Sequence, residues 1–90
     1  MKTGQTVMTR GIAAYVAENE QFALEVQLSM GLYLRKNWGV ISEDDKEMND
    51  LNVQSGTGSL MGAYETCKGR IWIMTEHDRS VTTVLFPSEY

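Results

Sequence analysis

Apolar residues recur at intervals of three or four along residues 20–36, which is the spacing of one face of an α-helix. The segment ends in Lys-Asn-Trp-Gly, where a cation near the last carbonyls and a following glycine favour helix termination. The pattern therefore predicts a long amphipathic helix with one buried face. The residues of this face are Phe22, Val26, Met30 and Tyr33.

A second stripe of leucines lies on another side of the same helix, because each member follows the previous one after four residues. A helix that is apolar on two sides is typical of a central helix, covered by a sheet and by another helix. The alternative is that the stripe forms a surface for dimerisation or for a partner. The stripe consists of Leu24, Leu28 and Leu32.

Two shorter helices are predicted on either side of this one. Thr9 is a suitable N-cap for a helix over residues 12–17, and Ser42 is a suitable N-cap for a helix that runs to Asn52. The third helix has few apolar residues, so we expect it to lie on the surface and to dock through a narrow apolar seam. That seam consists of Met48, Leu51 and Val53.

Beyond residue 59 the pattern changes to one that is typical of β-strands. Three strands are predicted at residues 60–66, 70–76 and 81–86, joined by short turns that force antiparallel neighbours. Residues 6–9 are either a further short strand or an arm. The predicted fold is α+β, with two or three N-terminal helices followed by a three-stranded antiparallel β-meander.

The chain of 90 residues carries a net charge of −4 and one cysteine. This length predicts a single domain over residues 1–90, too small for a methyltransferase or kinase of usual size. Cys67 has no partner for an intramolecular disulfide, which favours a reducing, cytoplasmic setting. No apolar run approaches the length of a membrane span, so we expect no membrane association. The acidic balance argues against broad binding of nucleic acid.

The excess negative charge is concentrated in the predicted third helix, where five acids are accompanied by one lysine. Acids in a first turn stabilise the positive end of a helix, so the simplest interpretation is a capped, solvated helix start. The alternative is a surface that docks into a basic groove by charge complementarity. A metal site is disfavoured, because these side chains point around the helix rather than toward one centre. The candidate partner-binding residues here are Glu43, Asp44, Asp45, Glu47 and Asp50.

The turn before the last predicted strand brings four titratable side chains together. Its simplest interpretation is a polar turn in which Asp78 accepts hydrogen bonds from backbone amides and Arg79 pairs with Glu76 or Asp78. The alternative is a recognition tip, with Glu76, Asp78 and Arg79 as partner-binding residues. His77 and Cys67 flank the preceding strand at opposite ends, so we expect them to lie too far apart for a catalytic dyad.

Aromatic residues on the strands suggest a second kind of surface. Trp72, with Tyr64 on the neighbouring strand and Arg70 nearby, would form a platform on which single-stranded nucleic acid stacks. The few cations around it make this interpretation the weaker one. No cofactor is predicted, since the glycine-rich segment 56–62 lacks the spacing of a phosphate-binding loop and precedes a strand instead of a helix.

Three segments are distinctive: residues 38–50, which begin Trp-Gly-Val-Ile-Ser, then Gly62-Ala63-Tyr64, and residues 71–90, which end Leu-Phe-Pro-Ser-Glu-Tyr. Together they resemble a family of small proteins carried on plasmids and other mobile elements of bacteria, described as plasmid-related or as type I restriction endonuclease subunit M. The resemblance covers roughly residues 20–90. This chain departs from the family at Arg35-Lys36-Asn37, where the family tends to have Arg-His and then Gly-Asp. The resemblance implies a bacterial, cytoplasmic, mobile-element context and supplies no catalytic residue.

These observations predict a non-enzymatic interaction protein with no metal and no cofactor. The hypothesis is that it binds a protein partner, a host nuclease or effector complex, as anti-CRISPR and anti-restriction proteins do. The alternative is a regulatory accessory module associated with nucleic acid, although direct nucleic-acid binding is not favoured. A homodimer formed through the leucine stripe stays open.

Overall fold

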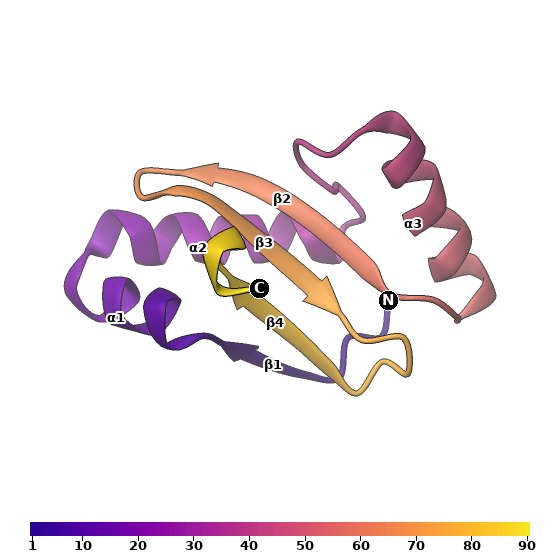
Figure 1. Ribbon diagram of the computed structural model, residues 1–90, viewed down its shortest axis with the longest axis horizontal. Coiled ribbons are helices and arrows are strands. Elements are labelled where there is room, and N and C mark those ends of the chain that lie inside the picture. The colour runs from indigo at the N-terminus through magenta and orange to yellow at the C-terminus, as the bar shows by residue number, and fades with distance from the viewer.

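The chain folds into a four-stranded sheet, three helices and one short 3₁₀ turn, shown in the computed structural model of residues 1–90 (Figure 1). The prediction of an α+β fold is confirmed. The strands are β1 (Gln5–Met8), β2 (Leu60–Thr66), β3 (Gly69–Thr75) and β4 (Val81–Leu85), in the sheet order β1-β4-β3-β2. The helices are α1 (Arg10–Glu18), α2 (Glu20–Leu34) and α3 (Glu43–Ser55), and the 3₁₀ turn is η1 (Pro87–Glu89).

The sheet is mixed, because β1 pairs in parallel with β4 while β2, β3 and β4 form an antiparallel meander. The predicted three-stranded meander is therefore only part of the sheet, and the helices follow a strand instead of opening the chain. Gly4, at φ +62°, leads into β1, and a Cβ there would collide with the backbone of Ser80. This close approach lets the Gln5 amide donate to the Ser80 carbonyl at 3.1 Å, which starts the parallel pairing.

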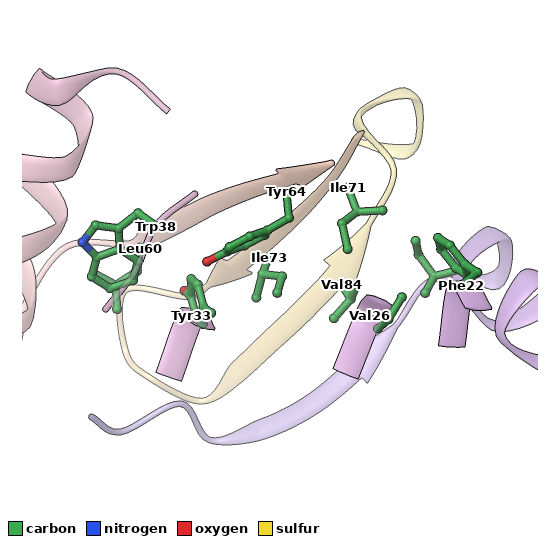
Figure 2. Packing of buried hydrophobic residues seen from close by; sticks show 10 residues of the cluster. Phe22, Val26, Tyr33, Trp38, Leu60, Tyr64, Ile71, Ile73 and Val84 are labelled. Carbon is green, nitrogen blue, oxygen red and sulfur yellow. The ribbon is translucent and has the colours of Figure 1, made fainter. Parts of the chain in front are cut away.

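Helix α2 runs along one face of the sheet, and its predicted buried face is confirmed. Side chains of α2 and of the strands point toward one another across this layer (Figure 2). Phe22 also stacks on Phe86 with 5.9 Å between ring centroids, which ties α2 to the segment after β4. The opposite face of the sheet, toward the viewer in Figure 1, has no α-helix over it and is crossed only by the short turn η1. The buried core consists of Ile12, Phe22, Val26, Tyr33, Trp38, Leu60, Tyr64, Ile71, Ile73 and Val84.

A chain of buried hydroxyl groups crosses this layer and connects α2 to the segment that precedes β1. Tyr33 and Thr75 lie 2.6 Å apart, Thr75 and Thr82 lie 2.8 Å apart, measured between hydroxyl oxygens, and Thr82 donates to the Thr3 carbonyl at 2.7 Å. Because the carbonyl only accepts and each hydroxyl has one proton, Tyr33 donates to Thr75 and Thr75 donates to Thr82. Burial raises the pKa of Tyr33 to about 12, so the phenol keeps the proton that this chain requires.

Two of the three leucines in the stripe of α2 are not covered, so the prediction of a helix buried on two sides is wrong. Leu24 is 54% exposed and Leu28 is 59% exposed, while Leu32 is half-buried. The sheet covers only one side of α2, and α1 packs near its N-terminal end, where Tyr15 contacts Phe22. An apolar surface therefore remains on the outer side of α2.

The N-terminus of α1 is capped from the far end of the chain. Thr9 occupies the N-cap position, but its hydroxyl accepts no helix amide and instead donates to Glu89 Oε1 at 2.6 Å. The other oxygen, Glu89 Oε2, accepts from the Gly11 amide at 3.0 Å. These bonds lower the pKa of Glu89, chiefly the one from Thr9, so the carboxylate stays ionised at a positive helix end. Thr9 is therefore the N-cap residue, as predicted, but the carboxylate of Glu89 in η1, and not the Thr9 hydroxyl, accepts the hydrogen bond from the helix amide.

Candidate protein-docking site on helix α3

Helix α3 begins and ends as its sequence indicates. Ser42 Oγ accepts from the Asp45 amide at 3.1 Å, which confirms Ser42 as the N-cap. Glu43, Asp44 and Asp45 occupy the first turn, where the helix end favours negative charge. Gly56 adopts the left-handed conformation that terminates the helix, at φ +72°. The helix therefore ends at Ser55 rather than near Asn52, where the sequence predicted its end.

Hydrogen bonds, and not an apolar seam, attach α3 to the edge of the sheet. The buried side chain of Asn49 donates to the Met61 carbonyl at 2.7 Å and accepts from the Met61 amide at 3.3 Å. Asn52 donates to the Ser59 carbonyl at 3.0 Å. The predicted seam is wrong for Met48, which is 57% exposed, and for Leu51, which is 60% exposed. Of the three residues assigned to the seam, only Val53 is partly buried against the core.

The Trp38-Gly39 segment supplies a second attachment for α3. Trp38 is buried, packs edge-on against Tyr33, and donates from Nε1 to Asp50 Oδ1 at 2.9 Å. Gly39, at φ +77°, lies so close to the Ala63 carbonyl that a Cβ would collide with it. This approach allows the Val40 amide to donate to the Ala63 carbonyl at 2.8 Å. Asp50 therefore has a role inside the fold, and the outer edge of β2 is largely covered.

The outward face of α3 combines acidic and apolar side chains. Glu43, Glu47 and Leu51 follow one another after four residues, and Asp44 and Met48 form the adjacent row. Glu43 pairs with Lys46 at 3.3 Å, whereas Asp44 and Glu47 are exposed and make no hydrogen bond or ion pair within the molecule. Beside Met48 lies a shallow groove of about 190 Å³ between α3 and the start of β2. Exposed apolar side chains inside a polar rim are a common pattern at protein interfaces, and the rim on α3 is acidic.

The hairpin tip between β3 and β4 lies against the C-terminal end of α3, because Arg79 connects the two. Its guanidinium donates to the carbonyls of Asn52 at 2.9 Å, Thr57 at 3.2 Å and Gly58. The predicted ion pair of Arg79 with the carboxylate of Glu76 or Asp78 does not form, because every acceptor is a backbone carbonyl. Besides those near the negative end of α3, Arg79 donates to the carbonyls of Glu76 and His77, each at 3.4 Å. These bonds within the molecule are sufficient to explain why an arginine occupies position 79. The contribution of Arg79 to the binding of another protein stays a prediction.

The structure brings Glu76 and Asp78 to the same end of the molecule as α3, and it leaves both side chains exposed. Asp78 Oδ1 accepts from the Ser80 hydroxyl at 2.6 Å and from the Ser80 amide at 3.0 Å. These bonds, first the one from the hydroxyl, lower the pKa of Asp78 and keep it charged. The prediction that Asp78 accepts from a backbone amide is confirmed. Glu76 has no partner within the molecule, so it adds free negative charge beside α3.

The predicted aromatic platform does not form. Trp72 and Tyr64 lie on opposite faces of the sheet, because Trp72 pairs with Ala63 and side chains alternate along a strand. Tyr64 is buried and donates to the Asn37 carbonyl at 2.7 Å, Trp72 packs against Tyr90, and Arg70 pairs with Glu65. The role of this protein as a nucleic-acid accessory module stays a prediction, without the surface from which it was inferred.

The remaining candidates for chemistry lie apart. Cys67 is in the turn before β3 and His77 is in the turn after it, at opposite ends of the strand, as predicted. The Cys67 amide donates to Glu25 at 2.9 Å, and the thiol has a raised pKa because it also donates to the Glu25 carboxylate. Nowhere do three or more His, Cys, Asp or Glu side chains converge as a metal site would require.

The exposed residues Met48 and Leu51 were missed as members of the candidate site. The available signal was the pair Asn49 and Asn52, whose spacing places two amides on the side of α3 that faces the strand edge.

No protein-family model matches the chain, and searches of curated proteins and of solved structures also found no match. None of its helices has both the length and the apolar character that crossing a membrane requires.

Proposed function

We propose that this protein is a non-enzymatic interaction module that binds a basic surface of a protein partner through the outward face of α3. The observation that carries the proposal is the exposure of Met48 and Leu51 among Glu43, Asp44 and Glu47 on a helix anchored by its opposite side. The apolar side chains would supply buried contact area, and the acids would steer association and select a positively charged groove.

The partner we propose is a bacterial nuclease or effector complex that defends the host against foreign nucleic acid. Such complexes carry basic grooves for their nucleic acid, and an acidic protein surface competes for a groove of that charge. The resemblance of residues 20–90 to plasmid and mobile-element proteins supports this choice. On this proposal the protein acts in the bacterial cytoplasm as an anti-restriction or anti-CRISPR factor, with Glu76 and Asp78 at the margin of the docking surface.

The proposal is tested by the recovery of a targeted plasmid in a bacterial host that has an active type I restriction or CRISPR system. We expect the wild-type protein to raise this recovery, and Glu47→Lys to lower the protection by about tenfold, because it reverses a charge that the fold does not use. Glu18→Lys is the matched control, since Glu18 is exposed and lies on α1, at the opposite end of the molecule (Figure 1).

The apolar part of the surface is tested by a second matched pair. Met48→Ser removes an exposed methionine from the docking face, whereas Met8→Ser removes an exposed methionine from β1. We expect only the first to reduce protection. Equal effects of Glu47→Lys and Glu18→Lys, or full protection by Met48→Ser, would show that α3 is not the docking surface. A wild-type protein that protects against none of these systems would refute the proposed partner.

A further inference from the structure

The uncovered leucine stripe of α2 calls for an explanation that is independent of α3. Leu24 and Leu28 are more than half exposed, and Leu28 and Leu32 border an open groove of about 340 Å³ that reaches Val40, itself 50% exposed. Single exposed apolar residues are ordinary on protein surfaces, but a contiguous row of them marks an interaction site.

The charges at the two ends of the stripe are complementary to each other. Glu20 precedes Leu24 by four residues, and Arg35, the C-cap residue that follows α2, comes seven residues after Leu28, so all four lie on one side of the helix. Neither Glu20 nor Arg35 forms an ion pair within the molecule. The negative charge of Glu20 is favourable at the N-terminal end of α2, and the positive charge of Arg35 is favourable at the C-terminal end. Because both side chains lie on the leucine side, the stripe is also complementary in charge to a second, antiparallel copy of itself.

Gly31 lies on the same side of α2, between Leu28 and Arg35. A Cβ built at Gly31 would meet no atom within 4 Å, so nothing inside the fold requires a glycine in this helix interior. Glycine there weakens the helix relative to alanine. What it does provide is a shallow depression on the outer side of α2, where the side chain of an opposing residue fits and two helices approach closely.

We propose that α2 forms an antiparallel pair with α2 of a second copy of this chain, related by a two-fold axis near Leu28. In this arrangement Glu20 lies opposite Arg35 of the partner subunit, and Leu24 lies over Gly31 of the partner subunit. The two helix dipoles oppose each other favourably, and every contact occurs twice by symmetry. The contact is small for a protein interface, so the dimer dissociates in the micromolar range. This proposal does not depend on the proposed function, because α3 lies outside the surface.

Sedimentation velocity and light scattering at rising protein concentration, from about 10 µM to about 500 µM, test the dimer. We expect Glu20→Arg and Arg35→Glu each to weaken self-association by at least about tenfold, since each variant places like charges opposite one another twice. The double variant Glu20→Arg/Arg35→Glu restores complementarity and the dimer. An equimolar mixture of the two single variants forms a heterodimer, because one copy then presents two arginines and the other two glutamates.

Matched leucine variants identify the helix that carries the contact. Leu28→Ser should abolish self-association, whereas Leu51→Ser on α3, which removes an equally exposed leucine, should leave it unchanged. Circular dichroism verifies that each variant is folded. A wild-type protein that stays monomeric throughout the concentration range overturns the proposal, and so does a double charge variant that stays monomeric. Because these measurements need no host system, their outcome is separate from that of the protection assay.

Discussion

Replacing Asn49 with alanine tests whether hydrogen bonds attach α3 to the sheet. Asn49 is 6% exposed and makes two bonds with the backbone of Met61, at 2.7 and 3.3 Å. Each such bond contributes about 1 kcal/mol net, and their loss leaves the Met61 amide and carbonyl without protein partners. We expect the free energy of unfolding to fall by about 2 kcal/mol, which corresponds to a melting temperature lower by about 8–16 °C for a domain of this size.

Thermal and urea unfolding, followed by circular dichroism and tryptophan fluorescence, measure this change. Trp38 donates to Asp50 of α3, so partial detachment of the helix alters its emission before the sheet unfolds. Met48→Ala is the matched control on the same helix, and because Met48 is exposed its effect should stay within about 0.5 kcal/mol. Helix propensity alone predicts that Asn49→Ala stabilises the protein by about 0.5 kcal/mol. An unchanged or raised melting temperature would therefore refute the attachment by amides.

Two further predictions concern other contacts that join distant parts of the chain, and a third concerns the glycine on the outer side of α2. Glu89→Ala should destabilise the protein by about 1 kcal/mol, the usual cost of losing an N-cap. The pKa of Glu89 is lowered from 4.5 in the folded protein, so its contribution to stability is present above pH 4.5 and disappears as the pH falls through the lower folded value. The melting curves of the wild type and the variant should therefore converge in acid. Arg79→Ala should cost about 2 kcal/mol in urea unfolding, and Arg79→Lys should recover less than half, because an ammonium cannot reach the same carbonyls. Gly31→Ala should stabilise the monomer by about 1 kcal/mol, measured at concentrations well below those of self-association, because a Cβ there meets open space.

Elements defined by local patterns were predictable from the sequence. The apolar spacing of Phe22, Val26 and Tyr33 located α2 and its buried face, and Ser42 located the start of α3. The antiparallel meander followed from short turns between alternating segments, which leave the chain little choice of neighbour. These features depend on residues close together in sequence, and simple periodicity rules describe them well.

The features that were missed depend on residues far apart in sequence. A short strand was one of the two alternatives predicted for residues 6–9, but the parallel pairing of β1 with β4 was missed, because β4 follows more than seventy positions later. Likewise, nothing near Thr9 indicates that Glu89 supplies the cap for α1, and nothing near Arg79 indicates that it bonds to carbonyls around the end of α3. Long-range pairings of this kind become visible only when tertiary structure brings the partners together.

The candidate site was predicted in part, and its acidic residues have different roles in the structure. Asp50 accepts from Trp38 and therefore serves the fold, Glu43 forms an exposed pair with Lys46, and Asp44 and Glu47 have no side-chain partner within the molecule. A helix held by apolar packing would have turned Met48 and Leu51 inward, because they are nearly its only large apolar residues. Attachment through Asn49 and Asn52 removes that requirement, and the apolar residues remain outside among the acids. The polar attachment of α3 thus accounts for its exposed apolar residues, which lie beside its free charge, and the proposed docking to a basic protein groove would use both.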